Sequence, residues 1–266
     1  MNRYIKIGLI LLISSSVIKA QNKIKDQLTV SLSNPARPGM VDVNLVYGQI
    51  YIQGYAGKDV IIDAASSGES QNESNEGLKR ISKGNPLGLS AEERNNNISV
   101  GTNSNAFPIN LTIKVPWRTS LRLRTYDKGD IIVENVIGDM EVDNVNGAIT
   151  LKNVGGSIVA NTYNGQLKAS FQNTRFDKPM AFSSMGGRIE VSYPSSLKAN
   201  VKVKSVNGEV FSDFNITKIP AGIVKTSNSG VNKSTLDGWL YGKIDAGGPE
   251  IMMSNYNGNI YLKKLK

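Results

Sequence analysis

The chain contains no cysteine and no histidine among its 266 residues. Without cysteine it forms no disulfide, so its stability must rest on backbone hydrogen bonds and on a buried apolar core. Without histidine it lacks the commonest general base and the commonest metal ligand. The two absences exclude catalytic arrangements built on Ser–His or Cys–His pairs. We therefore expect no catalytic residue, no cofactor and no metal site, and we expect that the protein is not an enzyme.

Helical and catalytic motifs are missing as well. No stretch repeats apolar residues at helical spacing over three turns, and no Ser-x-x-Lys motif or glycine-flanked nucleophile stands out. Sugar-cleaving enzymes on β-helical scaffolds, however, need only carboxylates. A carbohydrate-active enzyme acting on an acidic polysaccharide is therefore the alternative hypothesis. It predicts two or more carboxylates within about 5 to 10 Å of each other in a groove.

Residues 1–20 have the pattern of a secretory signal peptide. Arg3 and Lys6 form a short cationic start, an apolar run follows, and Ala20 ends a cleavage-site pattern. The run is too short for a membrane span. Cleavage after Ala20 removes Arg3, Lys6 and Lys19, which together lower the formal net charge from +9 to +6. We expect export to the periplasm or the cell surface, with residues 21–266 as the mature chain.

The stretch from Thr125 to Ala169 divides into consecutive nine-residue units with no remainder, namely TYDKGDIIV, ENVIGDMEV, DNVNGAITL, KNVGGSIVA and NTYNGQLKA. Every unit has glycine at its fifth position and apolar residues at its seventh and ninth. Alternate residues of a strand share a face, so these apolar residues point to one side. Each unit is therefore predicted to be a short strand followed by a turn.

One such strand cannot bury enough apolar surface to fold alone, so the units must stack their inner faces into a common core. We predict an all-β fold, a right-handed parallel β-solenoid (β-helix) with short glycine turns, forming a single elongated domain. With two units per coil, which we prefer, Ile131 lies over Ile149 and Asn135 over Asn153. With three units per coil, Ile131 lies over Ile158.

Two other folds share parts of this pattern. An antiparallel meander or sandwich would also alternate strands with Asn-Gly turns, although hairpins rarely keep one period through five units. A calcium-binding β-roll also repeats every nine residues, but it needs an aspartate in each turn. Only Asp130 and Asp139 occur at that position, so we do not expect calcium binding.

Outside the repeats we make three further predictions. The third-position residues Val136, Val145, Val154 and Tyr163 should add to the core. Residues from about 66 to 97 are polar and poor in β-branched side chains, and they are interpreted as an insertion in the solenoid. The segments before Leu45 and after Leu236 should cap the open ends of the stack, because exposed strand edges recruit other chains.

Basic side chains recur on the predicted solvent face. They are Arg122 and Arg124 on one strand and Lys198, Lys202 and Lys204 on or beside a later one. On one sheet they would form a cationic stripe that attracts an anionic ligand such as an acidic polysaccharide. The interleaved aromatics of single-stranded nucleic-acid binders are missing, so we expect no nucleic-acid partner.

Several stretches together resemble a known bacterial family. They are the glycine frame at residues 48–52, the segment 78–81, Val115-Pro116, the nonapeptide run, residues 199–201, residues 208–214, and the closing segments 247–250 and 257–260. This pattern is similar to the secreted family of repeated β-strand proteins of unknown function known as putative adhesins. The resemblance implies an exported β-solenoid with no established activity, and it supplies no catalytic or ligand residues. We therefore expect an exported, non-enzymatic adhesin, or a cell-envelope binding or structural protein, with surface glycans or other envelope components as its partners.

Overall fold

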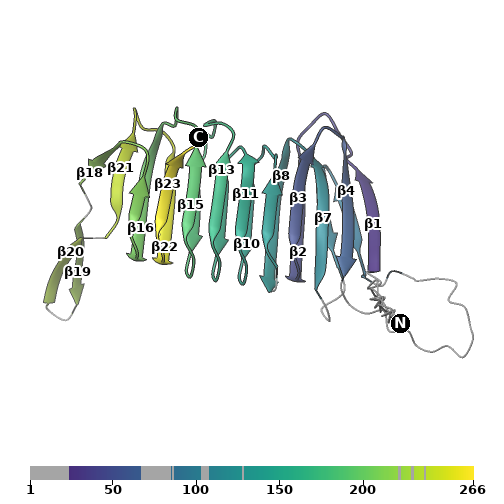
Figure 1. Cartoon of the computed structure of the whole chain (residues 1–266), viewed down its shortest axis with the longest axis horizontal. Helices are drawn as coiled ribbons and strands as arrows, with labels where there is room; N and C mark the ends of the chain where they lie inside the picture. Colours follow the sequence, from purple (N-terminus) through teal and green to yellow (C-terminus); the bar gives the residue numbers. More distant parts are fainter. Residues whose placement is uncertain are drawn as a thin grey trace, which may run out of the picture.

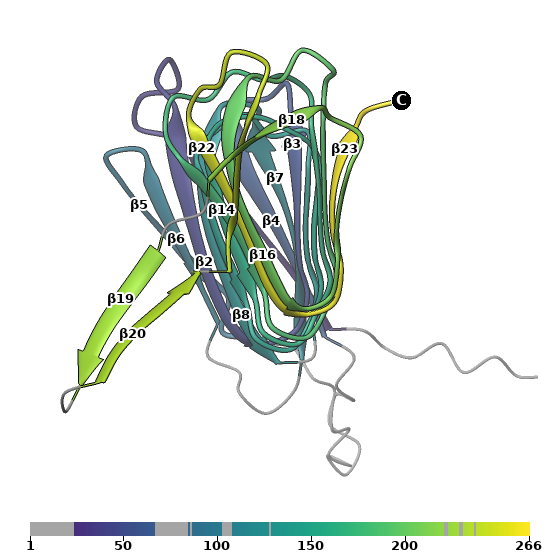
Figure 2. The same cartoon turned by 90° about the vertical axis from the view of Figure 1, so that its left-hand side faces the viewer.

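The computed structural model describes residues 24–66, 85, 87–102, 108–127, 129–220, 223–228, 231–236 and 238–266. The regular elements in these ranges are all β-strands, which confirms the all-β prediction. Most of them belong to two large sheets that lie face to face along an elongated stack (Figure 1). Viewed along the stack, the two sheets converge toward one tight bend (Figure 2).

The first sheet, sheet A, has the spatial order β1-β4-β7-β3-β9-β11-β13-β15-β23-β17. All neighbours from β7 to β17 are parallel, whereas β1–β4 and β4–β7 are antiparallel. The bounds of its strands are β1 Ile24–Ser31, β3 Ile50–Tyr55, β4 Asp59–Ser66, β7 Ile109–Pro116, β9 Ile131–Glu134, β11 Ile149–Val154, β13 Leu167–Phe171, β15 Ile189–Tyr193, β17 Val210–Ser212 and β23 Ile260–Lys264.

The second sheet, sheet B, has the order β18-β21-β16-β22-β14-β12-β10-β8-β2-β6-β5. It is parallel from β16 to β6 and antiparallel at both ends. The bounds of its strands are β2 Gly39–Tyr47, β5 Ser90–Arg94, β6 Asn97–Gly101, β8 Thr119–Asp127, β10 Met140–Asn144, β12 Ile158–Thr162, β14 Met180–Ser184, β16 Ala199–Asn207, β18 Ile216–Ile219, β21 Leu240–Ile244 and β22 Glu250–Asn257. The strands β19 Ile223–Asn228 and β20 Val231–Leu236 form a separate antiparallel pair.

Each coil consists of one strand from each sheet, so two nine-residue units complete one turn. Ile131 pairs with Ile149 in a parallel ladder, and the Asn153 side-chain amide donates to Asn135 Oδ1 at 2.7 Å. The preferred two-sided coil is therefore confirmed, and the three-sided version is wrong. Neighbouring strands are parallel through the repeats, so the hairpin alternative is wrong as well.

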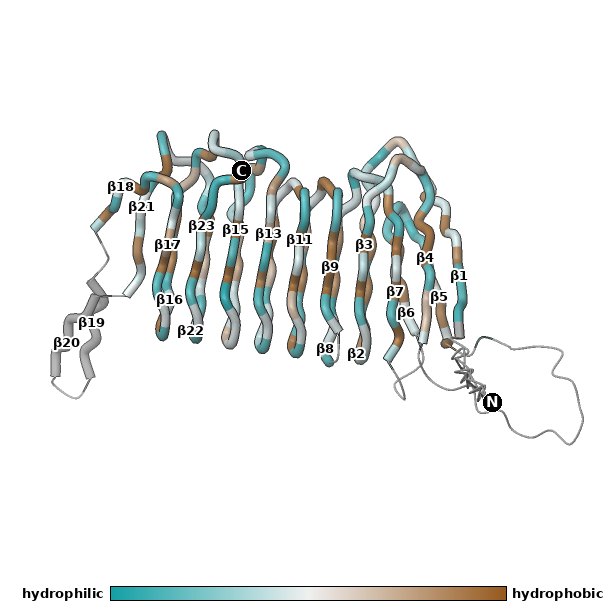
Figure 3. Tube along the Cα trace, in the orientation of Figure 1, coloured by the Kyte–Doolittle hydropathy of each residue, from teal (hydrophilic) through white to brown (hydrophobic). Residues whose placement is uncertain are grey.

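The seventh and ninth positions of the units fill the space between the sheets. Ile149 and Ile158 come from opposite sheets, both are 0% exposed, and both belong to one continuous core. The outer faces are mostly polar, so hydropathy alternates along the strands (Figure 3). Burial of each large aliphatic side chain contributes about 1.5–3 kcal/mol, and the parallel register repeats this contribution in every coil. At one end of the repeats the core becomes aromatic, with the rings of Phe171 and Tyr193 stacked at 4.3 Å.

The strand order departs from the sequence order at both ends. The coil β22–β23 lies inside the stack, between β14–β15 and β16–β17. Strand β2 is likewise internal, because it pairs with both β6 and β8. Neither the segment before Leu45 nor the one after Leu236 is therefore simply a cap, and that prediction was wrong in this respect. The strands at the ends of the sheets are β1, β5, β17 and β18.

The predicted insertion is only partly within the described residues. Residues 67–84 and 86 lie outside them, but the later part of the range contains strand β5, which pairs antiparallel with β6. Leu87 and Leu89 are buried in the core at 0% and 4% exposure. Residues 87–97 are therefore part of the solenoid body, because alternating apolar side chains anchor even this polar segment.

Candidate binding surface

Each coil passes from sheet B to sheet A through a glycine at the tight bend. A Cβ atom on Gly147 would lie 2.1 Å from the carbonyl oxygen of Gly129, and one on Gly165 would lie 2.0 Å from that of Gly147. Both distances are far shorter than an ordinary contact. Glycine is required here because successive bends stack backbone against backbone.

A row of buried polar side chains fixes these bends. Thr125, Asn144, Thr162 and Ser184 each donate a side-chain hydrogen bond to the carbonyl oxygen of the glycine one coil back, with distances of 2.9 to 3.1 Å. Asn255 does the same toward the oxygen of Gly187 at 2.6 Å. These bonds satisfy carbonyl groups that no ladder partner reaches. Because side chains alternate along a strand, the residue after each of them points outward.

Those outward residues form a row of apolar side chains across seven adjacent strands. We call it the corner row; its members, in the spatial order β2, β8, β10, β12, β14, β22, β16, are Val46, Tyr126, Val145, Tyr163, Met185, Tyr256 and Val206. Tyr126 is 61% exposed, Tyr163 53% and Tyr256 48%. At about 4.8 Å between neighbouring strands, the row is about 29 Å long. A contiguous apolar strip of this length on a polar face is typical of a binding surface.

A polar ladder runs beside the corner row, two residues earlier on the same face. It consists of Arg124, Asp143, Asn161, Ser183, Ser254 and Lys204. Asn161 donates to Asp143 Oδ1 at 2.9 Å, and the Ser183 hydroxyl donates to Asn161 Oδ1 at 2.6 Å. These bonds orient the ladder and leave hydroxyl and amide groups at the surface.

From β10 to β16 the members of the two rows line a groove of about 570 Å³, and Trp239 forms part of its lining. Val46, Tyr126 and Arg124, on β2 and β8, lie outside this groove. The Nζ atom of Lys202 lies 4.6 Å from the centroid of the Trp239 ring, and that of Lys204 lies 5.8 Å away. These cation–π contacts hold the indole at the groove. The groove therefore combines aromatic faces on one side with hydrogen-bonding groups on the other, which suits a ligand that has both an apolar face and a polar edge.

Comparison with known proteins gives a family match for part of the chain. Residues 125–238 match the Toastrack family, DUF4097. The resemblance predicted from the sequence is confirmed for this segment, which holds most of the groove lining, although Trp239, Ser254, Asn255 and Tyr256 lie beyond it. No curated protein matches the sequence.

Three solved structures are similar to this chain. A putative cell adhesion protein from Clostridium sporogenes has 12% identity and a TM-score of 0.44, covering 91% of this chain and 100% of its own. A putative adhesin from Bacteroides fragilis has 13% identity and a TM-score of 0.34, covering 92% and 98%. A putative adhesin from Parabacteroides distasonis has 9% identity and a TM-score of 0.28, also covering 92% and 98%.

The structure separates the predicted basic residues into two groups. Arg122 and Arg124 lie on β8, just before the matched segment begins, whereas Lys202 and Lys204 lie on β16, with four strands between them. Both arginines are ion-paired: Arg122 contacts Asp42 and Glu141, and Arg124 contacts Glu141 and Asp143. Lys198 precedes β16 and pairs with Asp245 at 3.1 Å. The five residues do not form one uninterrupted stripe, and of them only Lys204 lines the groove.

The corner row was missed from the sequence in part because two of its members, Val145 and Tyr163, were expected in the core. Val136 and Val154 are indeed fully buried, but Tyr163 is 53% exposed and Val145 is half-buried on the outer face. The third position therefore points inward at one bend and outward at the other. The prediction that all four residues add to the core was wrong for Val145 and Tyr163.

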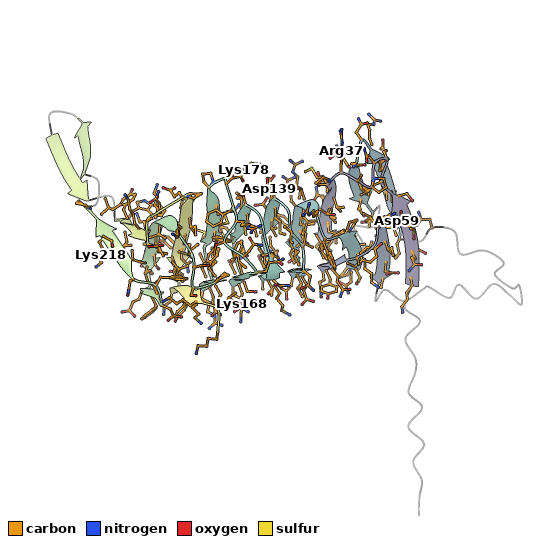
Figure 4. The ribbon with its side chains drawn as sticks, turned by 90° about the horizontal axis from the view of Figure 1, so that it is seen from above. Arg37, Asp59, Asp139, Lys168, Lys178 and Lys218 are labelled. Carbon is orange, nitrogen blue, oxygen red and sulfur yellow. The ribbon has the colours of Figure 1, made fainter. Side chains whose placement is uncertain are left out.

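A second groove, of about 370 Å³, contains the carboxylates Asp139 and Glu141. A hydrogen bond from Lys178 lowers the pKa of Asp139, and hydrogen bonds from Arg122 and Arg124 lower the pKa of Glu141. The Asp139–Lys178 pair lies on the edge of the stack (Figure 4). A general acid in glycoside hydrolysis needs a raised pKa, so these paired carboxylates do not suit that role.

Asp130 and Asp139, the two turn aspartates of the repeats, accept backbone hydrogen bonds instead. Their Oδ1 atoms receive the amides of Ala148 at 2.8 Å and Ser157 at 3.2 Å in the next coil. Within the described ranges, no group of three or more potential metal ligands comes together. The described part of the chain also has no helix that is long and apolar enough to span a membrane.

Proposed function

We propose that this protein is an exported, non-enzymatic binding protein of the cell envelope, with an adhesin-like role, and that the groove along the corner row binds an extended glycan. The observation that carries the proposal is the pairing of a seven-strand apolar row with a parallel polar ladder. Sugar rings have apolar C–H faces and hydroxyl edges, so they fit a surface with both kinds of side chain.

The regular spacing of the corner row indicates that its ligand is an extended glycan chain and not a single sugar. Tyr163 and Tyr256 are separated by Met185 alone, so two aromatic faces lie two strand spacings apart, about 10 Å. A linear glycan that crosses the strands would place successive rings along the row and its hydroxyls over Asn161 and Ser183.

Charge at the groove favours glycans that carry acidic groups. Lys204 lines the groove, and Lys202 lies against Trp239. We keep the five predicted basic residues as a proposed anionic-ligand surface, in which Lys204 contributes most because it alone of the five lines the groove. Binding to an acidic glycan should then weaken as salt rises.

The proposal includes features that lie partly outside the described residues. We take residues 1–20 to be a signal peptide that directs the chain to the periplasm or cell surface. We take the mature chain to be a single right-handed solenoid domain, because crossovers between parallel strands of one sheet are right-handed in about 98% of cases. Sequencing the exported protein should give Gln21 as its first residue.

Binding to soluble linear polysaccharides, neutral and acidic, at two salt concentrations tests the proposed function. The double variant Tyr163→Ala/Tyr256→Ala should weaken binding by about tenfold or more, since each lost aromatic contact costs about 0.5–1.5 kcal/mol beyond its buried area. Phe211→Ala is the matched control, because Phe211 is 44% exposed but lies on sheet A. It should leave the affinity unchanged.

Three results would count against the proposal. The wild-type protein could bind no polysaccharide in the panel, or the double variant could bind as well as the wild type. Alternatively, size measurements could show that the corner row is covered in a dimer, with the double variant monomeric. That last result would assign the row to self-association.

A further inference from the structure

A separate pocket lies at the opposite bend, where each coil passes from sheet A to sheet B. We call it the amide pocket; it has a volume of about 580 Å³ and is lined by Gly54, Tyr55, Trp117, Asn135, Ile137, Asn153 and Gln172. Its volume is in the range of small-molecule sites. None of its lining residues belongs to the corner row or carries a charge.

Amide side chains from successive coils form one part of the lining. Asn135 and Asn153 both have left-handed backbones, with φ of 59° and 53°. The Asn153 side chain donates to Asn135 Oδ1 at 2.7 Å, and the Gln172 side chain donates to the Asn153 carbonyl oxygen at 3.1 Å. The left-handed backbone and these bonds fix where the amides lie.

The three amides keep hydrogen-bonding capacity that the described protein residues do not use. The Asn135 Nδ2 atom is a donor, and the Asn153 Oδ1 and Gln172 Oε1 atoms are acceptors. None of these three atoms has a partner among the hydrogen bonds of the described residues. All three residues are exposed. The pocket therefore offers both donors and acceptors to a ligand, as a hydroxyl group requires.

Two aromatic side chains form the other part of the lining. Trp117 is 54% exposed, and the Tyr55 hydroxyl is held by donating to the Asp59 carbonyl oxygen at 2.8 Å. A Cβ atom on Gly54 would lie 1.9 Å from the Asn135 carbonyl oxygen and 3.2 Å from Trp117 Cδ1. The absence of a side chain at Gly54 thus lets both the indole and the Asn135 backbone pack closely against this residue.

The chemistry of the lining selects the ligand class. A charged ligand would lose hydration without gaining an opposite charge, which is unfavourable. A purely apolar ligand would leave the amides without partners. A neutral sugar satisfies both conditions, because its hydroxyls both donate and accept and its ring face packs on an indole.

We propose that the amide pocket is a second carbohydrate-binding site, specific for a neutral sugar residue and independent of the corner row. The rod would then carry two glycan sites at opposite bends. Such a protein can connect two glycan chains, or hold one chain at two points with the gain in avidity that linked sites give.

The chain has two tryptophans, Trp117 and Trp239, so fluorescence can report the amide pocket alone. In a Trp239→Phe background, the remaining indole is Trp117. We expect maltohexaose, cellohexaose or a linear mannohexaose to give a saturable change in its emission, and polygalacturonate to give a weaker one.

Asn153→Gly in that background should weaken the fluorescence response to the neutral hexasaccharide at least tenfold, because glycine tolerates φ of 53° and removes only the amide. Gln172→Ala gives a second test, should Asn153→Gly lower the melting temperature. Tyr163→Ala, in the corner row, is the control and should leave the response unchanged. An unchanged response in Tyr163→Ala would distinguish sugar binding at the amide pocket from glycan binding at the corner row, because the Trp117 response does not require binding at the corner row.

The inference is overturned if no neutral hexasaccharide changes the emission of Trp117. It is also overturned if the response persists in both amide variants, or if polygalacturonate binds more tightly than every neutral probe.

Discussion

The stacking of glycines at the tight bend makes a sharp prediction about Gly147. A Cβ atom there would lie 2.1 Å from the Gly129 carbonyl oxygen, against 3.4 Å for the start of ordinary contact. This oxygen is a backbone atom, so it cannot rotate away as the end of a side chain could. Gly147→Ala must therefore push neighbouring coils apart by about 1 Å, which is the difference between the two distances.

Such a displacement disrupts the hydrogen bonds that fix the bend. Asn144 donates to the Gly129 oxygen at 3.0 Å, and Thr162 donates to the Gly147 oxygen at 2.9 Å. Each bond contributes about 1 kcal/mol and leaves a buried carbonyl unsatisfied when it is lost. The loss of these two hydrogen bonds and the backbone strain should together lower the free energy of unfolding of Gly147→Ala by about 3–5 kcal/mol. The melting temperature should fall by about 10 °C.

Gly186 provides the matched control. A Cβ atom there would meet its nearest neighbours, Asn164 Oδ1 and the Tyr163 carbonyl oxygen, at 3.4 Å. Gly186→Ala should change the melting temperature by no more than about 2 °C, with a small increase expected from the loss of chain entropy in the unfolded state. Circular dichroism melts of both variants give the comparison. Equal melting temperatures for the two would refute the close stacking of the bends.

Two further predictions concern buried and charged groups. Thr162→Val keeps the side-chain shape but removes the donor to the Gly147 oxygen, so it should lower the free energy of unfolding by about 1–3 kcal/mol in a denaturant titration. Thr150→Val, on the outer face of sheet A, is the control and should change this free energy little. Burial raises the pKa of Glu190, but the hydrogen bond from Lys263 and the charges of Lys168 and Arg188 outweigh it, so the net pKa lies below the ordinary value of 4.5. A lowered pKa stabilises the fold above the unfolded-state value, and that stability is lost as the pH falls through the folded-state value. Glu190→Gln should therefore show a smaller drop in melting temperature between pH 7 and pH 3 than the wild type, and an equal drop would contradict this assignment.

The core was predictable because two simple periods coincide in it. Alternation along each strand sends Ile149 and Leu151 inward, and the nine-residue spacing repeats an apolar pair at the same two positions of every unit. Glycine at the fifth position marks each bend. These signals depend only on local geometry, so they appear in the sequence without knowledge of the tertiary structure.

The binding surface was not predictable, because identical residues play different roles at the two bends. Asn135 and Asn153 adopt the left-handed conformation at one bend, whereas Asn144 is an extended, buried strand residue at the other. All three occupy the second position of their nine-residue units. The sequence repeats every nine residues but the coil repeats every eighteen, so the inward and outward third positions look alike.

The position of the last coil also determines the surface. Tyr256 lies between Met185 and Val206 only because β22 inserts between β14 and β16. If the coils stacked in sequence order, Val206 would lie beside Met185, and the second aromatic face would move to the end of the sheet. A coil with glycine at the bend and apolar residues at the two inward positions can stack between two other coils, because the core requires only apolar side chains at those positions. The order of the coils is therefore a property of the whole stack. The corner row depends on that order, because only this order places Tyr163 and Tyr256 on either side of Met185. A ligand that contacts both tyrosines depends on it in the same way.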